Sequence, residues 1–94
     1  SADELAAVTT SIVNYLGDQL DSVSHGQVVV YQVDTDIQVD LMVNCASVLP
    51  AVTGVVAELL ELLNLEFPGE QFSQVQTPAE KSGKNGSYPL SINT

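Results

Sequence analysis

The part of the chain that decides the fold is the stretch VVVYQVDTDIQVDLMV, residues 28–43. Apolar residues occupy every odd position from Val29 to Val43 except Thr35, and this alternation is typical of a strand with one buried face. The many β-branched residues support the same interpretation. The stretch therefore predicts extended structure, either one strand of about 15 residues or two strands that fold back on each other.

The register of this stretch favours a hairpin. A three-residue loop at 34–36 pairs Val33 with Ile37 and keeps one face of both strands apolar, because odd residues then face odd residues. A two-residue turn at Thr35-Asp36 would mix apolar and polar residues on each face. Asp36 is expected to take the left-handed conformation that the longer loop needs. The alternative is a single long strand, which satisfies the same alternation.

Two amphipathic helices are expected to flank the hairpin. The first is predicted over about residues 3–22, because apolar residues recur there at steps of three and four after the capping-box spacing of Ser1 and Glu4. The second is predicted from the cap Ser47 to about Leu63. Its apolar arc of roughly 160° is wider than one small hairpin can cover.

The last third of the chain is polar and rich in turn signals. Proline and glycine divide residues 67–94 into short pieces, of which 72–75 and 88–92 are each expected to form a short strand. The sequence therefore predicts an α+β fold. Its core is a two-layer helix-hairpin-helix (α-β-β-α) over residues 1–66, and 67–94 form a C-terminal extension that is partly strand or loop. A two-stranded sheet is marginal alone, so these strands or a second copy of the chain are expected to complete it.

The charge balance excludes several classes of function. Twelve acidic residues face only two basic ones, Lys81 and Lys84, and the formal net charge is −10. Nucleic acids and anionic membrane surfaces are bound mainly through Lys and Arg, so neither is expected as a partner. The six glycines are scattered rather than arranged as a nucleotide-binding loop, and no cofactor is predicted.

No residue pattern predicts an active site. His25 is the only histidine. It follows a predicted helix, where it is expected to interact with the helix dipole or with solvent rather than to act as a base. Glu58 and Glu61 lie on the polar side of the second predicted helix, where a solvated surface explains them. The chain is therefore predicted not to be an enzyme.

Acidic residues of the hairpin are weak candidates for a metal site. Asp34, Asp36 and Asp40 alternate like the first ligands of a calcium loop. Gln38 stands at the third ligand position and no Glu closes the loop, so the calcium pattern fails. No metal is predicted, and an acidic hairpin tip that discourages aggregation is expected instead.

Two residues bear on the compartment of the protein. Cys45 is the only cysteine, so it is expected to be buried, to form an interchain disulfide or to be a reactive thiol. Asn85 begins an Asn-Gly-Ser sequon, a possible glycosylation site. Together with a chain that starts at Ser1 without Met, the sequon favours an extracellular protein.

Surplus apolar surface without catalytic groups predicts a non-enzymatic interaction or self-assembly protein, acting as a homodimer. Its expected apolar surface is on the second helix, at Val52, Val55, Val56, Leu59, Leu60 and Leu63. The edge of the hairpin is a second expected contact. Carboxylates that meet across an interface would make association stronger as pH falls or salt rises.

The alternative is a carrier of a small apolar ligand, such as a fatty acid or a sterol. The ligand would lie between the helices and the sheet, in a cavity lined by apolar and aromatic side chains. The candidate lining residues are Tyr15, Tyr31, Val39 and Leu41.

Overall fold

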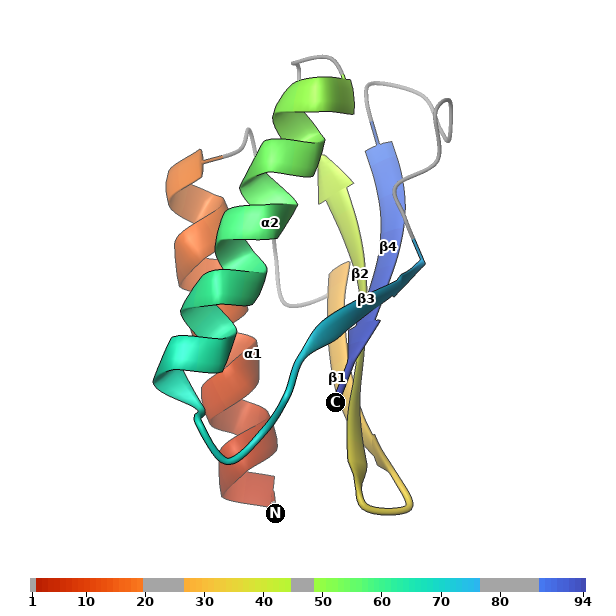
Figure 1. Cartoon of the computed structure of the whole chain (residues 1–94). Helices are drawn as coiled ribbons and strands as arrows, with labels where there is room; N and C mark the ends of the chain where they lie inside the picture. The colour runs from red at the N-terminus through yellow and green to blue at the C-terminus, as the bar shows by residue number, and fades with distance from the viewer. Residues whose placement is uncertain (1, 20–26, 45–48, 77–86) are drawn as a thin grey trace.

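The computed structural model describes residues 2–19, 27–44, 49–76 and 87–94. Its elements, in chain order, are α1 (Ala2–Gln19), β1 (Val28–Val33), β2 (Asp36–Asn44), α2 (Leu49–Glu66), β3 (Ser73–Gln76) and β4 (Ser87–Asn93). Both helices lie against one face of a single antiparallel sheet (Figure 1). The prediction of a small α+β domain is confirmed, including the two strands in the last third of the chain.

The two helices form where the apolar periodicity predicts them. In α1, Asp3 and Glu4 occupy the first turn, where carboxylates suit the helix dipole, and Val8, Ile12 and Leu16 form its buried stripe. The helix α2 ends at Glu66, and Pro68 disfavours helical conformation in the residue before it, Phe67.

The helices run in opposite directions and are joined by two side-chain hydrogen bonds. The Tyr15 hydroxyl donates to Glu58 Oε2 at 2.6 Å, and the Ser11 hydroxyl donates to Glu66 Oε2 at 2.9 Å. Burial of the phenol, followed by the hydrogen bond and the charge of Glu58, raises the pKa of Tyr15 to about 12. These bonds link the two helices at exposed positions.

The sheet has the strand order β1-β2-β4-β3, with every neighbouring pair antiparallel. The last strand of the chain therefore lies in the interior of the sheet, and β1 and β3 are its two edges. Each helix is followed by two paired strands, so the chain repeats an α-β-β order. Within the chain, β4 occupies the second edge of β2 that the predicted hairpin leaves open.

The predicted register of the hairpin is wrong. The turn is a two-residue turn at Asp34-Thr35, and Val33 pairs with Asp36 rather than with Ile37. Asp34, not Asp36, takes the left-handed conformation, with φ at 56°. Asp tolerates positive φ at such a turn because its short side chain can bond locally.

This register places odd residues of β2 opposite even residues of β1. The helices therefore cover Ile37, Val39, Leu41 and Val43 of β2, as predicted, but Val28 of β1 instead of Val29. Val30 also packs against the core and is partly buried, whereas the remaining apolar residues of β1 lie on the opposite face and are exposed: Val29 (53%), Tyr31 (38%) and Val33 (47%). Both faces of β1 are apolar, so alternation alone could not choose between them.

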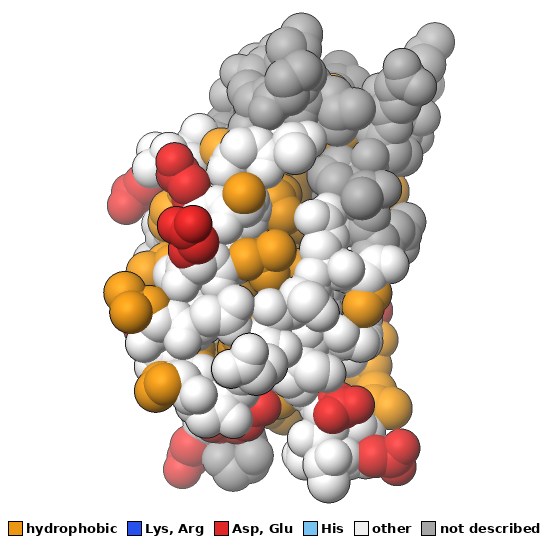
Figure 2. Space-filling view, viewed as in Figure 1, with side chains coloured by type: hydrophobic (Ala, Val, Ile, Leu, Met, Phe, Trp, Pro, Cys, Tyr) orange, Lys and Arg blue, Asp and Glu red, His pale blue; other side chains and the backbone are white. Residues whose placement is uncertain are grey.

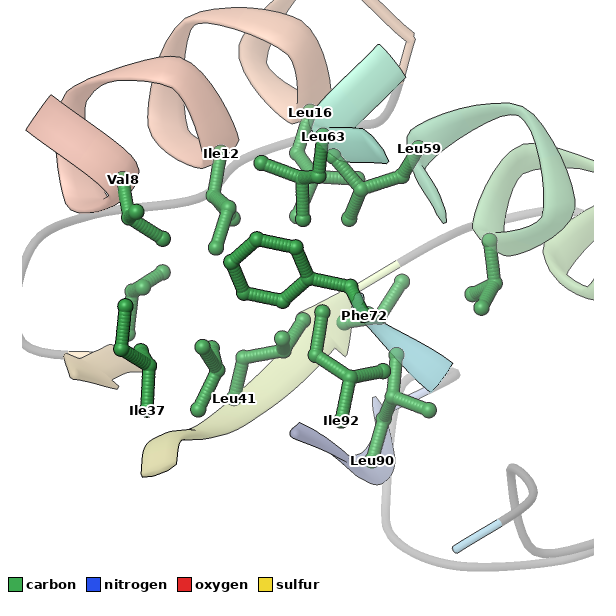
Figure 3. Close-up of a cluster of buried hydrophobic side chains, with 14 of the residues drawn as sticks. Val8, Ile12, Leu16, Ile37, Leu41, Leu59, Leu63, Phe72, Leu90 and Ile92 are labelled. Atoms are coloured by element: carbon green, nitrogen blue, oxygen red, sulfur yellow. The ribbon is translucent and has the colours of Figure 1, made fainter. Parts of the chain in front are cut away.

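The centre of the core is the ring of Phe72, just before β3. Figure 3 shows this ring between side chains of both helices and side chains of the sheet. The Asn64 side chain holds the Phe72 backbone from α2: its Oδ1 accepts from the backbone N–H at 2.7 Å and its Nδ2 donates to the carbonyl at 3.1 Å. Phe67 meets Phe72 edge to face, with ring centroids 6.4 Å apart. The polar last third of the chain thus supplies a central core residue.

The two edges of the sheet differ in how they are protected. Strand β3 has four residues and its pairing is irregular between Gln74 and Gln76, features that hinder further strand pairing. Strand β1 pairs in regular register over six residues and contains no charged residue and no proline.

Neither described helix is long and apolar enough to span a membrane.

Candidate functional site

The predicted interface residues of α2 lie mostly inside the chain. Val52, Val56, Leu59 and Leu63 are at most 1% exposed, and Val55 and Leu60 are partly buried against the same core. The wide apolar arc of α2 is thus covered within one chain, because α1, the sheet and Phe72 together surround it. The expected surface is a packing surface in this chain.

The four candidate ligand-lining residues are not brought together. Val39 and Leu41 belong to the core between helices and sheet, where side chains fill the space. Tyr15 contacts α2 through Glu58, and Tyr31 lies on the opposite face of the sheet.

The three carboxylates of the hairpin are also separated. Asp34 and Asp36 are exposed at the β1–β2 turn, whereas Asp40 lies further along β2 with side-chain partners of its own. The described residues contain no group of three or more side chains that could hold a metal ion. Cys45, Asn85 and His25 lie outside the described residues.

The sheet face away from the helices, here called the open face, carries a different set of side chains. Its central residue is Asp40. The Tyr31 hydroxyl donates to Asp40 Oδ2 at 2.7 Å, while the Ser91 hydroxyl and the Gln38 amide donate to Oδ1 at 2.7 and 3.2 Å. A further bond runs from Asn93 Nδ2 to Gln38 Oε1 at 3.4 Å. The network ties β1, β2 and β4 together across the open face.

Strand pairing explains why these side chains meet. Asp40 stands opposite Ser91 of β4, and Tyr31 stands opposite Gln38, so Tyr31 reaches Asp40 on the diagonal. The donors lower the pKa of Asp40, with Ser91 contributing most and Tyr31 next. The same bond to Asp40 raises the pKa of Tyr31. Asp40 is therefore an ionised carboxylate whose partners are all neutral.

A shallow depression of about 480 Å³ lies beside this network on the open face. Its lining is mostly apolar and comes from β1, β2, β4 and the residue before β1. The lining residues are Gln27, Val29, Asp40, Leu41, Met42, Pro89, Leu90 and Ser91. The side-chain amide oxygen of Gln27, Oε1, is buried without a hydrogen-bond partner.

The charge of the described surface has one sign. Lys81, Lys84 and His25 all lie outside the described residues, so the charged side chains that the structure describes are carboxylates. On the side shown in Figure 2 they gather at the lower end, near the β1–β2 turn and the N-terminus, and on the upper left over the helices. Burial, with Glu4 nearby, raises the pKa of Glu70.

Asp40 is a candidate from the sequence alone, but its partners are not evident there. Ser91, Met42 and Pro89 were not candidates, since their proximity to Asp40 depends on the pairing of β2 with a strand about fifty residues later. The only signal for the apolar residues of this face was the run of valines at 28–30, which gives β1 two apolar faces.

Comparison with protein families, with curated proteins and with solved structures finds no match for this chain, so its function has to be argued from its own residues.

Proposed function

We propose that this protein is a non-enzymatic self-association module that forms a homodimer through the outer edge of β1. The observation that carries the proposal is the contrast between a regular, uncharged β1 edge and a short, irregular β3 edge. Exposed edges of the first kind pair readily with other strands, and proteins usually protect them with charges, prolines or bulges. The predicted extracellular location and homodimer fit this proposal.

The register identifies the backbone groups that such pairing would use. In a two-residue hairpin the closing pair exchanges both hydrogen bonds, so Val33, Tyr31 and Val29 direct their backbone groups toward β2. The alternate residues Val28, Val30 and Gln32 then direct theirs to the outer edge. Among the described residues, no loop or turn backbone hydrogen bond reaches this edge.

A symmetric pairing centred on Val30 suits the side chains of the open face. It places Val29 of one copy beside Tyr31 of the other, so that two exposed apolar strips become one. Two four-stranded sheets would join into one continuous sheet. Burying these side chains would favour association at roughly 25 cal/mol per Å² of apolar surface.

The antiparallel arrangement also limits charge repulsion. The two acidic turns would lie at opposite ends of the joint, about 26 Å apart at Asp34. This separation exceeds the screening length of about 8 Å at physiological salt. Each copy still carries a formal charge of −10, so repulsion at longer range opposes association.

The decisive experiment changes the edge without changing the hairpin. Gln32→Pro removes an N–H that makes no bond to β2 and places a proline where edge strands accept it. Gln32→Thr is the matched control, because threonine keeps the N–H and favours strands. In sedimentation equilibrium, we expect dimers for the wild type and for Gln32→Thr, and monomers for Gln32→Pro.

The same experiment can overturn the proposal. A wild-type chain that stays monomeric at high micromolar concentration in physiological salt contradicts dimerisation. A Gln32→Pro variant that dimerises like the wild type contradicts the β1 edge as the interface. Circular dichroism of each variant verifies that the chain is folded.

Because the charged side chains of the described surface are all negative, dimerisation is expected to depend on pH and on salt. Protonating carboxylates or adding salt weakens the repulsion between copies, so we expect dimerisation to strengthen in both cases. Light scattering from about pH 7 to about pH 4.5 at low salt measures this response, and a flat signal would contradict it.

A further inference from the structure

The depression on the open face combines an apolar lining with hydrogen-bond acceptors. Val29, Met42 and Pro89 provide apolar walls, and Asp40 provides a carboxylate at one side. Its volume of about 480 Å³ is in the range of small-molecule sites. The lining comes from the three neighbouring strands β1, β2 and β4 and from Gln27, and the backbone hydrogen bonds of the sheet hold these strands in place.

Asp40 carries a negative charge that no described neighbour compensates, so a cation is its complementary partner. Three neutral donors, Tyr31, Ser91 and Gln38, orient its two oxygens and keep it ionised, but they leave its charge uncompensated. A carboxylate offers about four lone-pair positions, so one remains for a further donor. Charge-assisted hydrogen bonds to such a group are about twice as strong as neutral ones.

The Gln27 side chain provides a second acceptor at the depression. Its Oε1 atom is buried and makes no hydrogen bond, although the residue lines the depression. A buried acceptor without a partner costs about 1–3 kcal/mol, a cost that a bound donor removes once the Gln27 side chain turns this oxygen toward the depression. The carboxylate and this carbonyl oxygen are both acceptors, so the complementary ligand must carry at least two donors.

We propose that the depression binds a small organic amine, as a primary ammonium attached to a compact apolar group. The ammonium supplies three donors and a positive charge to Asp40 and Gln27. The apolar group covers Val29, Met42 and Pro89. This binding site shares Val29 with the proposed β1 joint, whereas the rest of its lining lies on β2, on β4 and at Gln27.

An NMR titration of the wild-type chain with phenethylammonium tests the proposal. We expect saturable shifts of the Met42 and Val29 methyl signals at constant ionic strength. The neutral analogue 2-phenylethanol has the same apolar group without the charge, and we expect it to bind at least about tenfold more weakly. Equal binding of the two probes would overturn the role of the carboxylate.

Two variants with the same change in net charge locate the cation. Asp40→Asn removes the charge in the depression, and we expect at least about a tenfold loss of affinity. Asp36→Asn removes an exposed charge of the same strand, and we expect affinity within about twofold of the wild type. Equal losses would show general attraction to an acidic protein and would overturn the site.

A third probe distinguishes a free amine from the side chain of a protein partner. N-acetyl-lysine methylamide carries the same ammonium on a longer stem with a peptide backbone. We expect it to bind more weakly than phenethylammonium, because the aromatic group fills the apolar part of the depression. Tighter binding of the lysine derivative would overturn the assignment to a small amine.

Discussion

The covered face and the open face of the sheet carry different side chains on the same strands. On the covered face, Val39 and Leu90 are at most 2% exposed and pack among apolar residues of both helices. On the open face, their neighbours Asp40 and Ser91 bond to each other across the same strand pair. The covered face therefore supplies most of the stability of the fold, and the open face carries the polar network.

Magnitudes support this division. Burying one large apolar side chain contributes about 1.5–3 kcal/mol, whereas a hydrogen bond between solvent-accessible groups contributes about 1 kcal/mol or less. Replacing residues of the two faces should therefore give clearly different losses of stability.

The largest effect is expected at the centre of the covered face. Phe72→Ala removes the ring that both helices and the sheet surround, and we expect the free energy of unfolding to fall by about 3–5 kcal/mol. Val75→Ala, at an exposed residue of β3, is the control and should cost less than about 1 kcal/mol. Urea denaturation measures both, and equal losses would refute the central position of Phe72.

An intermediate effect is expected where α2 holds the start of β3. Asn64→Ala deletes both hydrogen bonds to the Phe72 backbone and leaves two half-buried groups without partners. We expect a loss of about 1–3 kcal/mol, with faster amide exchange in β3.

Asn14→Ala is the control for this change, since Asn14 is exposed on α1. Its effect on stability should stay within about 0.5 kcal/mol. Losses of the same size for the two variants would contradict the anchoring of β3 by Asn64.

The smallest effect is expected on the open face. Ser91→Ala removes the donor that lowers the pKa of Asp40 most, so we expect that pKa to rise toward its ordinary value in an NMR titration. A carboxyl with a lowered folded pKa adds stability above its unfolded pKa, and this stability is lost as pH falls through the folded value. The variant should therefore lose less stability below about pH 4 than the wild type.

Ser73→Ala removes an exposed hydroxyl from β3 and is the control for the open face. It should leave the pKa of Asp40 unchanged. A shift as large as that of Ser91→Ala would show that the hydroxyl of Ser91 does not act directly on Asp40.

The elements of the fold could be predicted from the sequence because they depend on local patterns. Helical periodicity located α1 and α2, and short apolar alternations located the strands at 73–76 and 87–93 within one or two residues. The order of the strands could not be predicted, because pairing of β4 with β2 joins segments far apart in the chain.

The prediction of the hairpin register was wrong for a physical reason. Val28 and Val30 are as apolar as Val29, so either face of β1 could be buried, and the turn at Asp34 decided the outcome. The same ambiguity concealed the candidate site. One apolar face of β1 is exposed, and the Asp40 side chain accepts its hydrogen bond from Tyr31 on that same side of the sheet.

The interior position of β4 has a consequence for synthesis. Strand β2 leaves the ribosome about forty residues before β4, an interval of about 2–8 s at ordinary rates of translation. Until β4 arrives, the hairpin of β1 and β2 has two unpaired edges. Nascent chains on one polysome are therefore exposed to strand exchange with their neighbours, and the sheet closes only after its last strand has been made.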